Sequence, residues 1–260
     1  MASLANEEVS FASLSDLIEK DTVLAGNILR VVNSALYGRR GTINSVRHAV
    51  PLLGVNKLRN TVLGMSIARM WARVKTPGGW SMKNFNMHSV TAAVLSDRLA
   101  QEIGVSYPEG AFISGLLHDL GRLLIAVALT SEHAEIARLY AANEGTLCEC
   151  EREVLGFDHA EISATALAAW HLPMPIQVAV HYHHRPDDDP TLGAGNGAAE
   201  LSRVVFAADN YVNFLGNCIQ PKAADFDAVS QEHFFQMAGD SAESILRDFE
   251  AEYEAIEKFF

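Results

Sequence analysis

The sequence predicts an all-α protein built as two helical lobes. Apolar residues recur at intervals of three and four along most of the 260 residues, and no alternation of apolar and polar residues indicates a strand. The segment KTPGGW at 75–80 interrupts this pattern with a proline and two glycines. Ten basic and five acidic residues precede position 81, whereas ten basic and 27 acidic residues follow it. We therefore expect an N-terminal lobe over residues 1–76, a linker over 77–83 and a larger helical domain over 84–260.

The composition is that of a globular protein, with 49% hydrophobic and 20% charged residues. A net charge of −12 argues against a whole-molecule nucleic-acid binder. For the basic first lobe we favour docking of the two lobes on each other over a surface for nucleic acid or phospholipid. Three cysteines cannot form a fully paired framework, and MASLANEEVS does not resemble a secretory signal, so we expect a cytoplasmic protein. The apolar run 111–129 is long enough to span a membrane, but the charged residues near its centre argue against this.

The first lobe contains three segments with helical spacing. Residues 24–36 place five apolar side chains on one face of a helix that ends before Gly38. A second helix is expected over residues 43–54 despite Pro51, and a third over residues 56–74.

Eight further helical segments follow in the larger domain. They span residues 84–103, 109–129, 132–143, 147–155, 159–171, 174–184, 196–216 and 241–258. Asp158 and Glu161 have the spacing of a capping box at the start of the fifth segment. The polar segment RPDDDPTLGAGNG at 185–197 is typical of a surface loop of the kind that often lies near a site.

Polar residues interrupt several apolar helix faces. GLLHDLGRLL at 115–124 places His118 and Asp119 in the middle of an apolar helix. An unpaired buried carboxylate is so unfavourable that such groups are normally paired, neutralised or bound to a metal. His88 and Asp209 also fall on the apolar faces of their helices. We therefore expect two imidazoles and two carboxylates to converge in the interior.

These four side chains suit a metal ion. Imidazole nitrogen and carboxylate oxygen bind Zn, Fe, Mn or Ni, and helical bundles build such centres from inward-facing residues. Adjacent residues of a helix point about 100° apart. His118 and Asp119 can therefore reach one ion only if it lies beside the helix, and Gly115 and Gly121 permit that approach.

Five more histidines lie near helix ends and have a plainer interpretation. For His159 taken alone, we favour an exposed first-turn residue over a metal ligand. His171 follows a helix whose terminal carbonyl groups favour a nearby imidazolium. His181, His183 and His184 share that explanation, although three histidines in four positions exceed what the helix dipole requires.

The order of the polar residues resembles the HD superfamily of metal-dependent phosphohydrolases. The residues that carry this resemblance are His88, the pair His118 and Asp119 followed by Gly121 and Arg122, and Asp209 in FAADNY. Roughly residues 84–215 are similar to the HD-GYP branch, which places ligands for a second metal at the positions of His159, His183 and His184.

The resemblance implies one or two metal ions per chain, with Asp119 as the bridging ligand. The first site is completed by His88, His118 and Asp209, and the second by His159, His183 and His184. Arg122 stands where the enzymes commonly have a lysine. It is the candidate phosphate contact, because a guanidinium can bind phosphate through two hydrogen bonds.

Longer segments are similar to the HDOD domain family. LAGNILRVVNSALYG at 24–38 and TINSVRHAVPLLGVNKLRNTVL at 42–63 resemble the opening of HDOD domains, and AAWHLPMPIQVAVHYHHRP at 168–186 resembles a later family segment. The likeness covers nearly the whole chain, and the short start before Phe11 predicts a shortened or missing first family helix. The family implies a two-lobed bacterial signalling module related to HD hydrolases, without established hydrolysis. As partner we expect a signalling protein or a small phosphorylated ligand, with no nucleic acid and no membrane.

One departure from the enzymes separates the possible functions. HHRPDDDPTLG at 183–193 replaces the glutamate and the Gly-Tyr-Pro motif of HD-GYP enzymes, a loop implicated in cyclic dinucleotide recognition. We therefore expect a regulatory module with a structural or vestigial metal site. The alternative is a metal-dependent phosphohydrolase or phosphodiesterase with a one- or two-metal site. A third interpretation treats the histidines as hydrogen-bonded core residues of a helical scaffold.

Overall fold

The structure of the chain is a computed structural model that confirms the all-α fold. It describes residues 43–54, 74–142, 145–194, 197–220 and 231–257, together with nine isolated positions between residues 15 and 62. These residues form helices and turns, and the single β-type pairing among them is an isolated parallel bridge between Val105 and Ala199.

The structure describes eleven α-helices. They are α3 (Val46–Leu53), α5 (Met82–Glu102), α6 (Ala111–Leu117), α7 (Leu120–Ala128), α8 (Thr130–Ala141), α9 (Leu147–Leu155), α10 (His159–Ala169), α11 (Met174–Tyr182), α12 (Leu201–Phe214), α13 (Glu232–Ala238) and α14 (Ala242–Glu257). Three 3-10 turns add Pro108–Gly110, Pro186–Asp188 and Gly239–Ser241.

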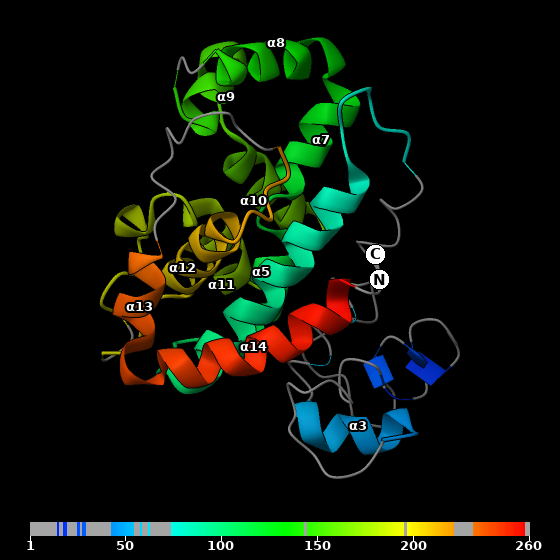
Figure 1. Ribbon diagram of the computed structural model, residues 1–260, viewed down its shortest axis with the longest axis vertical. Helices are drawn as coiled ribbons and strands as arrows, with labels where there is room; N and C mark the ends of the chain where they lie inside the picture. The colour runs from blue at the N-terminus through cyan, green and yellow to red at the C-terminus, as the bar shows by residue number, and fades with distance from the viewer. Residues whose placement is uncertain are drawn as a thin grey trace.

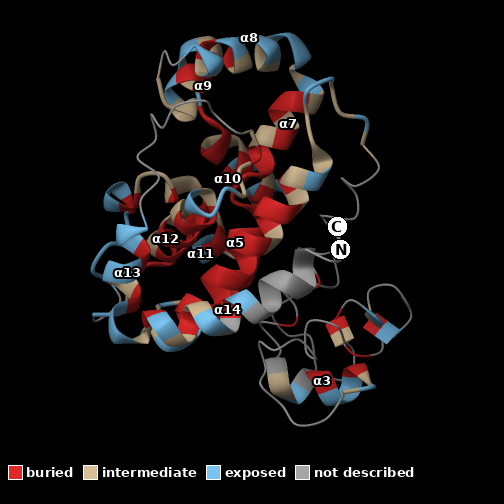
Figure 2. Ribbon diagram, viewed as in Figure 1, coloured by how far each residue is buried: buried red, intermediate tan, exposed pale blue. Residues whose placement is uncertain are grey.

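Helix α5 forms the centre of the bundle made by α5 to α14. The side chain of Ser81 caps its first turn by accepting a hydrogen bond from the backbone N–H of Asn84 at 3.1 Å. The helix packs on α6, α12 and α14, and Figure 1 shows it running through the middle of the bundle. Residues 91–100 are all buried (Figure 2). Because α5 is covered on every side along this stretch, polar side chains on it point into the interior.

The long apolar segment that carries His118 and Asp119 is not one helix. The prediction of a continuous helix over residues 109–129 is wrong, because α6 ends at Leu117 and α7 begins at Leu120. The hydroxyl of Ser163 accepts a hydrogen bond from Gly121 N–H at 2.7 Å and donates one to the carbonyl of His118 at 2.9 Å. These two backbone groups would otherwise bond within a continuous helix. The α10 side chain therefore stabilises the break.

Two glycines bring the helices on either side of this break close to their neighbours. A Cβ at Gly115 would lie 2.7 Å from the carbonyl oxygen of Ala92 and 2.8 Å from the Cα of Ala93, so α6 packs directly on the backbone of α5. A Cβ at Gly121 would overlap the backbone carbonyl of His159 at the start of α10. The glycines therefore serve the contact between helices, which is a more specific role than the approach to an ion expected from the sequence.

The remaining expectations for the helices are mostly met. Pro51 lies inside α3 as expected. Helix α12 begins at Leu201 and not at residue 196, and α13 is an additional helix that the apolar spacing does not indicate. The expected helices at 24–36 and 56–74 fall almost entirely outside the described residues. The division into two lobes and a linker stays a prediction.

One stretch meets the length and composition of a membrane span. Pro108–Ala128 has a mean hydropathy of 1.5, but 78% of its most apolar window is buried inside the protein. A core segment of a soluble protein has these properties, and α6 and α7 lie among the buried elements of the bundle (Figure 2).

We predict that Gly121→Ala lowers the free energy of unfolding by about 1–3 kcal/mol or more, because the added methyl group overlaps the backbone of His159. Urea denaturation would measure the loss. Gly104→Ala is the matched control, because a Cβ there meets no atom within 4 Å. Equal stability of the two variants would contradict the close packing of α7 on α10.

Candidate metal centre

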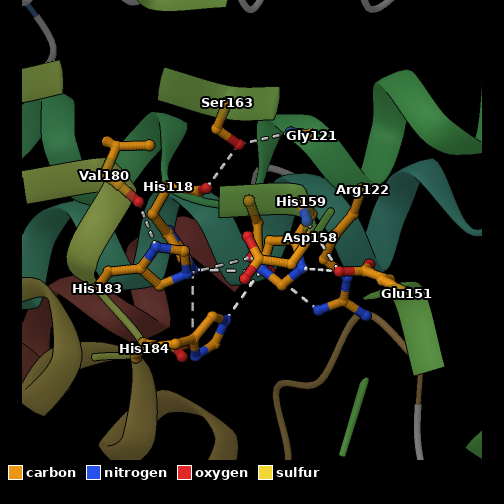
Figure 3. A network of polar contacts seen from close by, with 12 residues as sticks. His118, Gly121, Arg122, Glu151, Asp158, His159, Ser163, Val180, His183 and His184 are labelled. Atoms are coloured by element: carbon orange, nitrogen blue, oxygen red, sulfur yellow. Dashed lines mark hydrogen bonds and ion pairs between the residues drawn. The ribbon is translucent and has the colours of Figure 1, made fainter. Parts of the chain in front are cut away.

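Seven titratable side chains from five parts of the bundle meet in its interior. His88 comes from α5, His118 and Asp119 from the break between α6 and α7, His159 from the first position of α10, His183 and His184 from the end of α11, and Asp209 from α12. All are buried except His184, which is half-buried. Figure 3 shows the imidazole rings of His118, His159, His183 and His184 gathered in one place.

The first group consists of His88, His118 and Asp209, whose donor atoms lie within 4.8 Å of one another. The Nε2 atoms of the two histidines are 3.2 Å apart. Oδ1 of Asp209 lies 3.1 Å from Nε2 of His88 and 3.5 Å from Nε2 of His118. One carboxylate oxygen and two ring nitrogens thus face a common point.

The second group consists of Asp119, His159, His183 and His184, again with donor atoms within 4.8 Å of one another. Nε2 of His159 lies 2.9 Å from Nε2 of His184 and 3.1 Å from Oδ1 of Asp119. Nε2 of His183 lies 3.8 Å from the same carboxylate oxygen. Three imidazoles and one carboxylate surround this second point.

Asp119 connects the two groups through its two oxygens. Its Oδ1 faces the second group, whereas its Oδ2 lies 3.5 Å from Nε2 of His88 and 3.6 Å from Nε2 of His118. Oδ2 also accepts a hydrogen bond from Nη1 of Arg122 at 2.9 Å. This carboxylate therefore occupies the position that a bridging ligand requires.

Hydrogen bonds at the opposite ring nitrogen fix the tautomer of four histidines. Because backbone carbonyl oxygens only accept, Nδ1 must be the protonated nitrogen where it faces one. Three Nδ1 atoms face a backbone carbonyl oxygen: His88 faces that of Asn217 at 2.7 Å, His118 that of Gly115 at 2.8 Å and His183 that of Val180 at 2.6 Å. Nδ1 of His159 faces Oε2 of Glu151 at 2.7 Å. In the neutral rings, Nε2 therefore carries a lone pair that points into the centre.

Lone pairs that face each other need a cation between them. Two neutral Nε2 acceptors at 3.2 Å, as in His88 and His118, repel unless a proton or a metal lies between them. Among the described residues, Nε2 of His183 is a buried nitrogen with no hydrogen-bond partner. Both observations fit a metal. Imidazole nitrogens with carboxylates suit Zn, Fe, Mn or Ni.

Burial and neighbouring charges set the protonation of the centre. Burial raises the pKa of Asp119, but His118 and other cationic neighbours outweigh this and lower it well below its usual value. Burial lowers the pKa of His159, but Glu151 and Asp119 raise it to about 10. Burial and the neighbouring imidazoles lower the pKa of His183 to about 3. Without metal, His159 therefore holds a proton while His183 stays neutral.

The structure groups the seven residues as the family resemblance implies, although their role as ligands stays a prediction. The interpretation of His159 as an exposed first-turn residue is wrong, because its side chain is buried. The first helical position points inward here because α7 and α10 meet at Gly121. Arg122 binds Asp119, so its contact with phosphate also stays a prediction.

His171 and His181 lie outside both groups. His171 is exposed and has a positive φ of 57° just after α10. Its backbone N–H bonds to Ala168, and that of Leu172 bonds to Leu167, which is a Schellman cap. The ring of His181 contacts Tyr182 with a centroid separation of 4.4 Å.

Sequence reasoning missed Glu151 of α9. Its carboxylate is buried and accepts hydrogen bonds from both the ring and the backbone N–H of His159. The segment LCECERE offers little signal for this role, since acidic residues that alternate with others on a short helix are usually solvated.

Comparison with known proteins gives a family and a fold. The model of the HDOD domain family matches residues 1–186. An uncharacterized protein of Treponema pallidum (strain Nichols) is 23% identical over 182 residues, which cover 70% of this chain but 35% of that protein. The chain thus spans about a third of the length of this relative.

Two crystal structures are similar in fold, with 98% or more of this chain covered. An HDOD domain protein of unknown function from Geobacter sulfurreducens has a TM-score of 0.74 at 23% identity, with 100% of this chain and 89% of that chain covered. A proposed phosphohydrolase from Shewanella amazonensis SB2B has a TM-score of 0.69 at 23% identity, with 98% and 90% covered. At this identity the similarity establishes the fold.

We predict that the free energy of unfolding of the metal-free protein falls as the pH rises from 7 to 9. The pKa of His159 is about 10 when folded, against 6.5 in the unfolded chain, so the folded state binds the proton more tightly in this range. One such group contributes up to about 1.4 kcal/mol per pH unit. Urea denaturation in the presence of EDTA would measure the profile.

The variant His159→Gln should reduce this pH dependence, because its amide does not titrate. His118 still titrates, since burial lowers its pKa but Asp119 and Asp209 outweigh this and raise it. A flat profile for the unaltered protein, or the same slope in the variant, would show that His159 is not the group responsible.

Proposed function

Since the chain belongs to the HDOD domain family, we propose that it is a regulatory module of a signalling pathway, with one or two metal ions in its HD-like core. On this proposal the module acts by binding a signalling protein or a small phosphorylated ligand. On this proposal one ion is bound by His88, His118 and Asp209 and the other by His159, His183 and His184. Asp119 would contribute one oxygen to each ion. The ions would supply the positive charge that the inward-facing lone pairs of the histidine Nε2 atoms and the carboxylate oxygens require.

The observation that carries the proposal is the burial of the candidate ligands. Six of its seven side chains are buried, and His184 is half-buried. Structural metal sites are usually fully enclosed by protein ligands, whereas catalytic sites keep a position open to substrate. A buried centre therefore favours a metal that holds or switches the fold over one that meets a substrate.

The loop beyond His184 is held against α12 and does not contain the recognition motif of HD-GYP enzymes. The carboxylate of Asp189 is buried and accepts hydrogen bonds from the backbone N–H of Thr191 at 2.8 Å and from the hydroxyl of Ser202 on α12. Arg203 of α12 also pairs with Asp187 at 2.6 Å. The segment that replaces the recognition motif of HD-GYP enzymes is therefore tied to the bundle.

A second candidate function is a metal-dependent phosphohydrolase. Two observations favour it. Two groups of potential metal ligands lie on either side of Asp119, and the partly exposed guanidinium of Arg122 lies next to that carboxylate. Two metal ions with a bridging carboxylate can activate water and stabilise a phosphoryl transition state. The similarity to a proposed phosphohydrolase keeps this candidate, although it rests on the fold.

Elemental analysis and a hydrolysis screen separate the two functions. We predict that protein purified without a histidine tag contains one or two metal ions per chain and does not hydrolyse bis(4-nitrophenyl) phosphate or cyclic dinucleotides with added Mn²⁺ or Fe²⁺. Metal-dependent turnover that disappears in Asp119→Ala would establish the hydrolase instead. Absence of metal, also after incubation with these ions, would contradict the centre.

We predict that Asp119→Ala loses bound metal and melts at a lower temperature, because the variant removes a carboxylate that belongs to the second group and lies next to both histidines of the first. Metal content and differential scanning calorimetry measure the two effects. Asp188→Ala is the matched control, since Asp188 is an exposed residue of the loop. Unchanged metal content and melting temperature in the Asp119 variant would count against the site.

A further inference from the structure

We propose that Glu151 is a positioning residue that raises the metal affinity of the second group and leaves the first group unaffected. This inference rests on the proposed metal centre. Glu151 is on α9, outside the seven candidate ligands, and its carboxylate is buried beside His159 (Figure 3).

A single oxygen of Glu151 holds His159 at two points. Oε2 lies 2.7 Å from Nδ1 of the ring and accepts a hydrogen bond from the backbone N–H at 2.9 Å. The ring is thus oriented with Nε2 toward Asp119 and His184. A carboxylate behind a histidine ligand fixes the tautomer and makes the inward nitrogen a stronger donor to a metal.

Local interactions at the ends of α9 and at the start of α10 stabilise this contact. A capping box between Thr146 and Glu149 starts α9, and Gly156 ends it in a left-handed conformation with φ of 82°. Asp158 then caps α10 and forms an ion pair with Arg152 of α9. Three separate devices therefore fix the two helices so that Glu151 faces the first residue of α10.

The first group has no equivalent carboxylate among the described residues. The outer nitrogens of His88 and His118 face backbone carbonyl oxygens, which are uncharged. In the second group, His183 is likewise held by a carbonyl, and among the hydrogen bonds of the described residues only His159 is held by a side-chain carboxylate. A charged acceptor polarises the imidazole more than a neutral one. Loss of the Glu151 charge should therefore weaken one group of ligands and spare the other.

A plainer role for Glu151 is to satisfy the first N–H of α10. The variant Glu151→Gln separates this role from the proposed one. Its amide oxygen can still accept a hydrogen bond and its volume is nearly unchanged, but it carries no negative charge. A purely structural residue would tolerate this change with both metal affinities intact.

The experiment is a titration of the metal-free full chain with Co²⁺. Isothermal titration calorimetry and visible absorption both monitor the binding. We expect two binding events in the unaltered protein. In Glu151→Gln, binding to the second group, which contains His159, should weaken by about 10–100-fold. Binding to the first group should keep its affinity. Glu153→Gln is the matched control, because Glu153 is exposed on the same helix and the charge change is identical. Asp209→Asn should instead weaken binding to the first group, which contains Asp209, and leave binding to the second group unchanged.

The outcomes separate this inference from the function on which it rests. Wild-type affinity at both events in Glu151→Gln would overturn the positioning role and leave the metal centre standing. Equal weakening of both events with a lower melting temperature would also overturn it, because the effect would then be a loss of fold. No Co²⁺ binding by the unaltered protein would overturn the metal centre and the inference together.

Discussion

The interior depends on imidazole rings whose outer nitrogens are already bound. Backbone carbonyls hold Nδ1 of His88, His118 and His183, and the carboxylate of Glu151 holds that of His159. Their Nε2 atoms consequently point inward around Asp119, where neutral nitrogens repel one another. Such a centre requires bound positive charge, which the proton on His159 supplies in the metal-free protein and metal ions would supply when bound.

The irregular parts of the fold follow from this requirement. His118 and Asp119 are adjacent in sequence, and in an unbroken helix their side chains would point about 100° apart. The break between α6 and α7 lets both face the centre, and Ser163 stabilises that break by bonding to the backbone on each side. Close contact at Gly121 then brings the start of α10 against α7, which carries His159 inward.

The sequence predicts most of the described helices because they depend on short-range patterns. The placement of His159, His183 and His184 among the candidate ligands rests instead on the family resemblance, and the role of all seven residues as ligands stays a prediction. Polar residues on apolar helix faces, as at His88 and Asp209, are sufficient to indicate an interior site. The break at His118 could not be predicted in this way, since it depends on a hydroxyl that lies 42 residues from Gly121. Glu151 was hidden for a related reason, because its burial depends on a turn and a neighbouring helix that an acidic segment does not reveal.

Anomalous X-ray diffraction from crystals grown with Mn²⁺ or Fe²⁺ would show whether Asp119 joins two metal positions inside the bundle. We expect one peak among His88, His118 and Asp209, a second among His159, His183 and His184, and contact of Asp119 with each occupied position; this is the bridged centre that we infer. Peaks only at the surface, or inward nitrogens joined by hydrogen bonds with no metal between them, would contradict it.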